Sequence, residues 1–238
     1  MKKEMSKEQI DFQECLNANT SPTNNEQFDR DGYLVLKNIC DPKELYCVPP
    51  TNKGQYHYYR KIEKFSYQPV ETQVNGSTSR YYYPPYKNIH SDVRLKIEKE
   101  IGKKLINTYY YDRFYNPGQE LTNHIDRPAC EISVTIHIGS NMNSSWPIWI
   151  KTPDIYDDPI KKTKIIKKGE NRSVILKPGD GMIYKGCERP HWREKMPGFK
   201  RNIIRKWLKM EELYYHQVFF HYVLSDGNRV QFAFDRGN

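Results

Sequence analysis

The sequence predicts a mainly β protein with flanking helices, in which two sheets pack as a double-sheet jelly roll. The first observation is a change of period, because after Leu105 large apolar residues recur at every second position, as in strands. The second is the order of elements, since helical patterns come first and short strands follow, separated by turn residues. The third is that no repeat of 20–50 residues is visible, which argues against solenoids and propellers.

The N-terminal part divides into a tail and the start of the domain. Residues 1–25 are polar and rich in turn formers, so we expect a flexible tail there and a single domain over residues 26–238. The domain opens with a short helix, a turn at Asp31-Gly32 and a strand. Asp41 and Pro42 predict the start of a second helix. The stretch 51–90 is tyrosine-rich and broken by prolines, and we expect it to be irregular.

The clearest helix pattern is “SDVRLKIEKEIGKKL”. Ser91 suits its N-cap, because a serine hydroxyl can accept a hydrogen bond from the first free N–H groups. Its apolar positions are Val93, Leu95, Ile97, Ile101 and Leu105. This stripe predicts a helix that packs on one side of the sheets.

Eight short stretches have the composition and alternation of strands. They are “INTYYYDRFYN”, “CEISVTIHI”, “WPIWIKT”, “TKIIKK”, “RSVILKP”, “GMIYKG”, “HQVFFHYVLSD” and “NRVQFAFD”. Eight strands are enough to build the two sheets of a jelly roll.

The composition indicates a globular protein and argues against a disordered chain and against a membrane-spanning one. Of the 238 residues, 37% are hydrophobic, and 19 tyrosines and 9 phenylalanines argue against disorder. No apolar run approaches the ~20 residues of a membrane helix, and no signal peptide is apparent. The five cysteines are odd in number and lack a zinc-ribbon spacing. We therefore expect free thiols in a reducing, cytoplasmic environment.

The positive charge is concentrated in one zone. Residues 161–209 contain 16 Lys and Arg against 4 Asp and Glu, a net of +12, whereas the whole chain has a net charge of +9. Such a zone can attract phosphates, nucleic acid or an acidic substrate. The alternative is a solvated, lysine-rich hairpin edge, which “IKKTKIIKKGE” resembles.

Three residues form a candidate metal site. His124 and Asp126 are two apart, so in a strand their side chains share a face. A third ligand must come from a distant strand, and His191 follows a tight turn and a short strand in “LKPGDGMIYKGCERPHW”. Two imidazoles and a carboxylate leave three coordination positions open, as in non-haem Fe(II) oxygenases, whereas zinc favours a closed set of four. A satisfied polar pair at a strand end is the alternative for His124 and Asp126.

The other histidines have weaker claims as metal ligands. His57 and His90 lie in the irregular or helical N-terminal half. His137 is one residue out of phase with its isoleucine neighbours. His216 and His221 flank an aromatic strand and suit the core.

Three motifs together resemble the Fe(II)- and 2-oxoglutarate-dependent oxygenase superfamily, most closely its prolyl-4-hydroxylase-like branch. They are “FYNPGQELTNHIDRPACEIS”, “LKPGDGMIYKGCERPHW” and “HQVFFHYV”, and the resemblance covers roughly residues 106–238. It implies a double-stranded β-helix core and Fe(II) bound by the catalytic residues His124, Asp126 and His191. It also implies a dioxygenase that hydroxylates a C–H bond of a peptide, amino acid or other small molecule. 2-Oxoglutarate would be converted into succinate and CO₂, and ascorbate is allowed as an additional cofactor.

The resemblance also places two contacts to 2-oxoglutarate. Tyr115 stands where several prolyl-hydroxylase-like enzymes have a tyrosine that contacts this cosubstrate. The far carboxylate needs a cationic partner, and the usual spacing gives Lys200 and Arg201, in a segment that has the pattern of an inserted helix. His216 is the candidate on the last core strand. We predict Arg193 instead, because it lies two residues after His191 and a guanidinium can donate two hydrogen bonds to a carboxylate.

Two other functions stay open. A nucleic-acid demethylase of the same chemistry is suggested by the basic zone and by “HWREKMPGFKRNIIR”. A non-enzymatic jelly-roll binding module would be favoured by the loss of a metal ligand. The tyrosines of residues 81–86 suit either a lid that holds the substrate or a cover for a sheet face.

Overall fold

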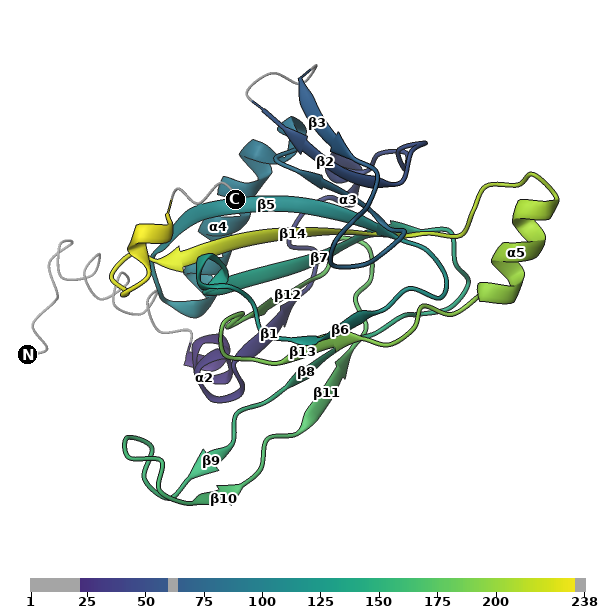
Figure 1. The fold of residues 1–238 in the computed structure, drawn as a ribbon. Coiled ribbons are helices and arrows are strands. Elements are labelled where there is room, and N and C mark those ends of the chain that lie inside the picture. Colours follow the sequence, from purple (N-terminus) through teal and green to yellow (C-terminus); the bar gives the residue numbers. More distant parts are fainter. Residues whose placement is uncertain (1–21, 60–63, 234–238) are drawn as a thin grey trace, which may run out of the picture.

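The computed structural model describes residues 22–59 and 64–233, and its core is two facing antiparallel sheets (Figure 1). The major sheet has the order β1-β12-β7-β14-β5-β4-β2-β3. Its strands are β1 (Tyr33–Leu36), β12 (Gly181–Tyr184), β7 (Ile132–Ser140), β14 (Tyr215–Leu224), β5 (Leu105–Tyr115), β4 (Thr78–Tyr81), β2 (Gly54–Tyr58) and β3 (Phe65–Gln68). All neighbours in it are antiparallel except β2 and β4. The jelly-roll prediction is confirmed.

The minor sheet covers one end of the major sheet. It has the order β11-β8-β13-β6 and consists of β11 (Asn171–Val174), β8 (Ile148–Lys151), β13 (His191–Arg193) and β6 (Leu121–His124). Ile148 and Ile150 of β8 pack against Met182 and Tyr184 of β12, which joins the two sheets into one roll. A hairpin of β9 (Ile155–Tyr156) and β10 (Ile165–Lys167) projects beyond the minor sheet.

Alternation sorts the side chains of the major sheet into two faces. On β14, Val218, Phe220 and Tyr222 pack in the cluster that includes α4 (Lys87–Ile101), and we call this side the α4 face. The intervening residues, such as Tyr215 and Phe219, pack in a second cluster between the two sheets, which we call the barrel interior. Because successive residues of a strand point to opposite sides, each strand contributes to both.

Helix α4 differs from its predicted boundaries. It begins at Lys87, so Ser91 lies inside it, and no side chain caps its first turn. Val93, Ile97 and Ile101 are buried, as an i, i+4 stripe requires, but Leu95 is exposed and lies off the stripe. The helix ends at Gly102, whose φ of 65° is left-handed and favours glycine. Leu105 therefore belongs to β5.

The other helices are short. They are α2 (Pro22–Asp31), α3 (Pro42–Leu45), α5 (Phe199–Trp207) and the 3-10 turns η1 (Pro84–Tyr86), η2 (Pro128–Cys130) and η3 (Val230–Phe232). Asp41 caps α3 by accepting a hydrogen bond from the Lys43 N–H, as predicted. Helix α2 begins within the stretch expected to be a tail. The rest of that stretch, residues 1–21, lies outside the described residues.

Three further expectations can be compared with the structure. The stretch 51–90 contains β2, β3 and β4 rather than irregular chain alone, and the predicted strand “NRVQFAFD” contains η3. The expectation of free thiols is confirmed for Cys40, Cys47, Cys130 and Cys187, whereas Cys15 is outside the described residues. Within the described parts of the chain, no helix combines the length and the apolar character needed to cross a bilayer.

Candidate metal centre

The two strands that carry the histidines are neighbours in the minor sheet. Strands β6 and β13 pair antiparallel, with His191 directly opposite His124. Asp126 follows two residues after the end of β6, and its Oδ1 lies 3.6 Å from His124 Nε2 and 3.5 Å from His191 Nε2. The ligand atoms of all three residues lie within 4.8 Å of one another. The structure thus brings together the three predicted ligands, although Asp126 is in the loop after β6 and not in the strand.

Both imidazoles are oriented by the backbone. Nδ1 of His124 lies 2.8 Å from the Thr122 carbonyl oxygen, and Nδ1 of His191 lies 3.0 Å from the Arg189 carbonyl oxygen. A carbonyl oxygen only accepts, so each Nδ1 carries the proton and donates it. Each Nε2 then presents a lone pair toward the other ligands, which is the tautomer a metal requires.

Hydrogen bonds at its backbone N–H and at Oδ2 hold Asp126 in place. Its backbone N–H donates to the Gly186 carbonyl at 2.9 Å, and the Ser133 hydroxyl donates to its Oδ2 at 2.9 Å. The same hydroxyl lies 2.9 Å from His221 Nδ1, so a chain of hydrogen bonds runs from the buried His221 to the carboxylate. A Cβ at Gly186 would stand 2.4 Å from Asp126 Oδ2, so this close approach requires a glycine. These contacts leave Oδ1 free for a metal.

The donor set fits Fe(II). Two nitrogen lone pairs and a carboxylate oxygen face one point, an arrangement that a cation would stabilise. Among the described residues, no fourth histidine, cysteine or carboxylate belongs to the group, so three positions stay open. Burial lowers the pKa of His191, although Asp126 acts to raise it, and this keeps the imidazole neutral for binding. The Gln73 side-chain nitrogen lies 3.4 Å from His124 Nε2, at the edge of the site.

Arg193 lies in the barrel interior, two residues along β13 from His191. Its side chain is 1% exposed, and its guanidinium donates to the Trp146 carbonyl at 2.5 Å and to the Tyr215 hydroxyl at 3.4 Å. It lies over both rings, at 4.6 and 4.8 Å from their centroids. Its Nε has no hydrogen-bond partner, and no carboxylate of the described residues pairs with it.

Tyr115 joins the same group. Its ring packs edge-on against Trp146 at 5.1 Å, and it lies opposite Tyr215 in the pairing of β5 with β14. Its hydroxyl accepts a hydrogen bond from Arg113 Nη1 at 3.3 Å. The two residues predicted to contact 2-oxoglutarate are therefore joined through Trp146 and Tyr215.

The two other candidates for the cationic contact lie elsewhere. His216 is on the α4 face, where its Nε2 is 2.9 Å from Asp112 Oδ2 and its ring stacks on Phe114 at 4.0 Å. Arg201 is exposed on α5, which projects from the end of the roll (Figure 1). Of the three candidates, only Arg193 lies in the barrel interior.

Comparison with solved structures shows where this architecture recurs. EctD from S. alaskensis, solved with 2-oxoglutarate and 5-hydroxyectoine, aligns with a TM-score of 0.51 at 12% identity, over 93% of this chain and 79% of its own. AviO1 from Streptomyces viridochromogenes Tue57 aligns with a TM-score of 0.51 at 10% identity, over 86% and 95% of the two chains. SnoN, a non-haem α-ketoglutarate-dependent epimerase from nogalamycin biosynthesis, gives 0.50 at 8%, over 83% and 81%. No family model and no curated protein matches the sequence.

The chain has the fold of the Fe(II)/2-oxoglutarate oxygenases. The fold that the sequence motifs implied is therefore confirmed, and at these low identities the comparison extends no further than the fold. Within this fold, the three predicted ligands occupy the adjacent strands β6 and β13 of the minor sheet and the loop after β6.

Several polar residues of the barrel interior are missing from the sequence-based site. Thr135 Oγ1, His137 Nε2 and both atoms of the Gln217 amide are buried and have no hydrogen-bond partner among the described residues. Gln217 lies opposite His137 in the pairing of β14 with β7. The out-of-phase position of His137 was the available signal, because alternation puts it on the side opposite the isoleucines. Unpartnered polar atoms gathered in one interior indicate a polar ligand.

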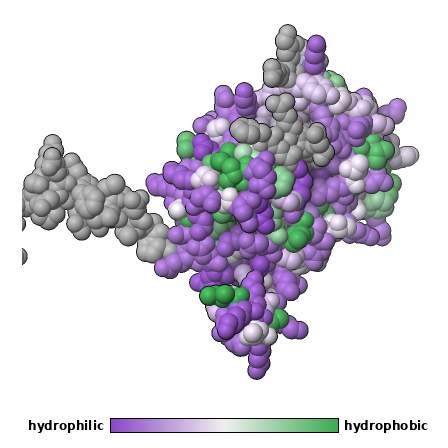
Figure 2. All heavy atoms as spheres, turned by 60° about the vertical axis from the view of Figure 1, so that its left-hand side comes forward, coloured by the Kyte–Doolittle hydropathy of each residue, from purple (hydrophilic) through white to green (hydrophobic). Residues whose placement is uncertain are grey.

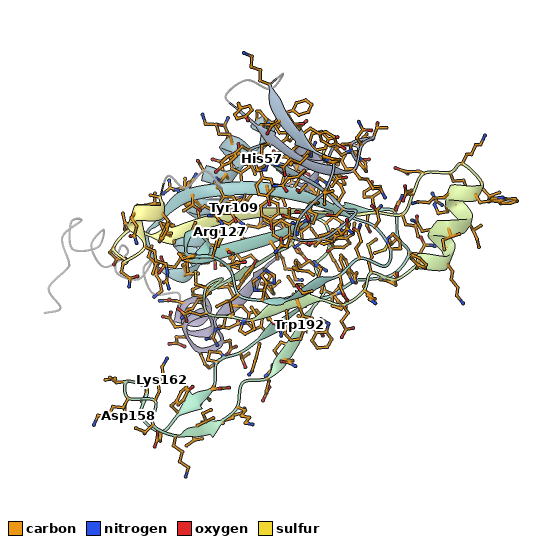
Figure 3. The ribbon with its side chains drawn as sticks, in the orientation of Figure 1. His57, Tyr109, Arg127, Asp158, Lys162 and Trp192 are labelled. Atoms are coloured by element: carbon orange, nitrogen blue, oxygen red, sulfur yellow. The ribbon has the colours of Figure 1, made fainter. Side chains whose placement is uncertain are left out.

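Stacked aromatic rings line the rest of the interior. His57, Tyr81, Tyr111 and Phe219 form a ladder across β2, β4, β5 and β14, with centroid distances of 4.6, 4.8 and 4.5 Å. Beside it, Arg127 covers the ring of Tyr109 at 4.2 Å (Figure 3). Two tyrosines of residues 81–86 lie on opposite faces of the major sheet. Tyr81 belongs to this ladder, whereas Tyr86 is buried on the α4 face.

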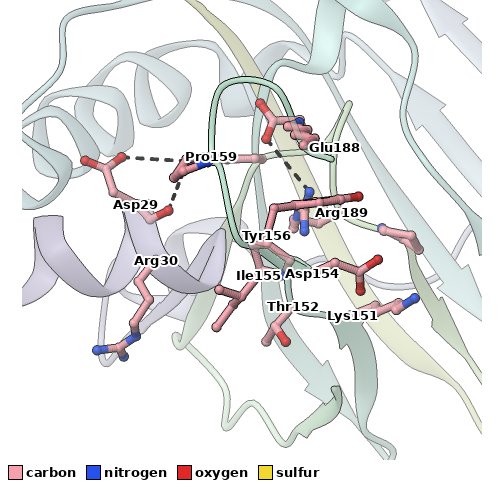
Figure 4. A pocket seen from close by; sticks show the side chains of 14 residues that line it. Asp29, Arg30, Lys151, Thr152, Asp154, Ile155, Tyr156, Pro159, Glu188 and Arg189 are labelled. Atoms are coloured by element: carbon pink, nitrogen blue, oxygen red, sulfur yellow. Dashed lines mark hydrogen bonds and ion pairs between the residues drawn. The ribbon is translucent and has the colours of Figure 1, made fainter. Parts of the chain in front are cut away.

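A pocket of about 580 Å³ lies outside the roll, between α2 and the start of the β9–β10 hairpin (Figure 4). Its lining has mixed charge, and Lys185 with Asp29 and Arg189 with Glu188 form ion pairs in it. None of the three ligands lines it. The candidate site is therefore identified by the chemistry of its three ligand residues and not by the volume of a pocket.

Proposed function

We propose that this protein is an Fe(II)- and 2-oxoglutarate-dependent dioxygenase that hydroxylates a C–H bond of a peptide, an amino acid or another small molecule. His124, Asp126 and His191 would hold the iron, which when bound supplies the oxidising chemistry. The similarity in fold to EctD, solved with 2-oxoglutarate, and to SnoN, an α-ketoglutarate-dependent epimerase, supports the cosubstrate.

The observation that carries the proposal is the unpaired guanidinium of Arg193. A buried charge without a partner costs several kcal/mol, so a fold keeps one only where something compensates it. A ligand carboxylate in the barrel interior would accept two hydrogen bonds from this side chain. Arg193 would hold the far carboxylate of 2-oxoglutarate, and Tyr115 would position the cosubstrate beside it. The aromatic ladder would exclude water from the reacting atoms.

The two alternatives make different demands on the structure. A binding module needs no complete ligand set, yet all three candidate ligand residues are present, and hydrogen bonds hold both imidazoles in the tautomer that binds a metal. A nucleic-acid substrate needs a continuous basic surface beside the site. The cations of residues 161–209 are instead shared among the β9–β10 hairpin, the minor sheet and α5, and the hairpin and α5 project at different ends of the molecule (Figure 1). This separation gives no support to a nucleic-acid substrate.

Anaerobic titration with Fe(II), followed by a succinate assay with 2-oxoglutarate and O₂, tests the proposal. We expect one Fe(II) per chain in the wild type and no stoichiometric binding in His191→Ala. His57→Ala is the matched control, because His57 is outside the ligand group, and it should bind one Fe(II). Turnover by His191→Ala at the wild-type rate would refute the site. Iron and 2-oxoglutarate binding without succinate, with all candidate substrates, would favour the binding module.

A further inference from the structure

Helix α5 is attached to the protein by its polar side. It lies in the connection between β13 and β14. Asn202 is its buried residue, and its side chain accepts a hydrogen bond from the Leu213 N–H at 2.7 Å and donates to Glu212 at 3.3 Å. Lys206 pairs with Glu212 at 3.0 Å, and Arg205 Nε donates to the Glu211 carbonyl at 2.7 Å. The face toward the protein is thus hydrophilic.

The apolar side of α5 points into solvent. Phe199, Ile203 and Trp207 follow an i, i+4 spacing, and Ile204 and Leu208 lie beside them on the same arc. Trp207 is 81% exposed, and the other four are each more than half exposed. A surface helix normally turns its apolar stripe toward the core, so this orientation is the reverse of the usual one. An exposed apolar patch of this kind marks an interaction surface.

The surface around this apolar arc is basic. Lys200, Arg201, Arg205, Lys206 and Lys209 lie in or next to α5, and residues 195–210 contain no Asp or Glu. Lys200, Arg201 and Lys209 have no ion-pair partner among the described residues. By contrast, the face that carries the β9–β10 hairpin is mostly hydrophilic, with small separated apolar spots (Figure 2). Basic charge and apolar area therefore coincide at α5.

We propose that α5 binds to the surface of a membrane that contains anionic phospholipids. Aromatic and aliphatic side chains on one face with Lys and Arg around them are the features of a helix that lies in the plane of the interface. The nine residues of α5 span only ~13 Å, too short to cross a hydrocarbon core of ~30 Å. A second copy of the chain fits the surface less well, because pairing two α5 helices would bring their cations together. The proposal does not depend on the proposed catalytic function.

Flotation with vesicles tests this inference. The full-length protein is mixed with vesicles of phosphatidylcholine alone or with about 30% phosphatidylserine. We expect binding to the anionic vesicles that weakens as salt is raised, and much weaker binding to phosphatidylcholine. Each Lys or Arg near an anionic surface contributes about fivefold, so Lys200→Gln with Arg201→Gln should lower the affinity about 30-fold. Trp207→Ser should lower it as well, because it removes buried apolar area.

The matched control changes the same charge elsewhere. Lys161→Gln with Lys162→Gln removes two cations from the exposed tip of the β9–β10 hairpin and should leave vesicle binding unchanged. An equal loss in this control would show attraction by net charge alone and would overturn the proposal. So would the absence of binding to anionic vesicles. A dimer in sedimentation that Trp207→Ser dissociates would assign the surface to a second copy instead. Circular dichroism confirms that each variant is folded.

Discussion

Buried charges are paired differently on the two faces of the major sheet. On the α4 face, Asp112 is fully buried and is bonded to Arg80, to the Tyr86 hydroxyl at 2.8 Å and to His216 Nε2 at 2.9 Å. Burial acts to raise the pKa of Asp112, but Arg80 and His216 outweigh it and hold the pKa well below its usual range. The buried charges of Asp112 and Arg80 are thus matched to each other within the described part of the chain.

The barrel interior contains one buried arginine that pairs with a carboxylate and one that does not. Arg113 is fully buried and pairs with Glu71 at 2.9 Å, so it resembles the arginine of the α4 face. Arg193 has only a carbonyl, a hydroxyl and two aromatic rings around it. Of these two buried arginines, the one on the strand of His191 is the one without a carboxylate.

The difference in how the buried arginines are paired indicates where a ligand is expected. A paired arginine stabilises the fold only as long as its carboxylate is present, and removing one partner leaves a buried charge. An arginine without a carboxylate partner already has the energetic cost of an uncompensated buried charge. The unpartnered atoms of Thr135, His137 and Gln217 add the cost of buried polar groups. We infer that the α4 face is structural and that the interior gains its missing partners from a ligand.

The largest expected effect is on the α4 face. Asp112→Asn keeps the shape of the side chain but leaves Arg80 buried without a counter-charge. We expect the free energy of unfolding, measured with urea, to fall by about 3–5 kcal/mol. Asp158→Asn in the exposed β9–β10 hairpin is the control and should change it by less than about 0.5 kcal/mol. A loss below about 1 kcal/mol in Asp112→Asn would show that the pair is not structural.

Arg193→Met should affect ligand binding more than stability, unlike Asp112→Asn. No carboxylate is left unpaired, so the loss of stability should be smaller than in Asp112→Asn. The affinity of the iron-loaded protein for 2-oxoglutarate, measured anaerobically by calorimetry, should fall by about 2–4 kcal/mol, or roughly 30- to 1000-fold. Arg201→Met, on α5, should bind 2-oxoglutarate like the wild type. Normal binding by Arg193→Met would remove the contrast between the two faces.

The sequence predicted the grouping of His124, Asp126 and His191 better than the interior around it. His124 and Asp126 are close in the chain, and His191 follows a turn and a strand whose order is readable, so local spacing was sufficient. Thr135 and Gln217 are single polar residues within apolar strands, and nothing local separates them from ordinary core positions. Their common location depends on the pairing of β7 with β14, which the sequence does not display.

The fold shows the same limit. The alternating strands after Leu105 were predicted because period two is a local property, and η3 is the exception where the alternation of “NRVQFAFD” misled. Strands β2, β3 and β4 were missed because prolines and tyrosines dominate the surrounding sequence. They pair with one another and, through β4, with the distant strand β5. The start of α4 at Lys87 depends on the preceding turn η1 and on no capping side chain, so Ser91 was the wrong boundary.

A smaller effect concerns the neutral histidine of the α4 face. Burial lowers the pKa of His90 to about 3, although its hydrogen bond to the His221 carbonyl acts to raise it. The unfolded chain therefore binds a proton below pH ~6.5 that the folded protein does not bind until about pH 3, and stability falls as the pH falls between these values. From pH 6.5 to 4.5 this histidine should contribute a loss of about 2–3 kcal/mol.

His90→Gln isolates that contribution, since its amide can still donate to the His221 carbonyl but does not titrate. Urea unfolding at the two pH values should show a smaller acid-induced loss in the variant than in the wild type. The remaining loss comes from other groups, such as Asp112, and is common to both proteins. An equal loss in both would mean that His90 does not contribute to the acid sensitivity of the α4 face.

The smallest effect belongs to Tyr115, which shares its interior position with Arg193 but carries no charge. Tyr115→Phe removes the hydroxyl and leaves the ring against Trp146, so packing is kept and one hydrogen bond is lost. If that hydroxyl contacts 2-oxoglutarate, the KM for 2-oxoglutarate should rise about 2- to 12-fold, which corresponds to about 0.5–1.5 kcal/mol. Iron affinity should be unchanged, because Tyr115 is not in the ligand group. Tyr110→Phe is the matched control, since Tyr110 lies on the same strand but packs on the α4 face. A rise in KM in Tyr115→Phe alone would place the cosubstrate on the interior side of β5, whereas equal values in both variants would exclude Tyr115 as a contact.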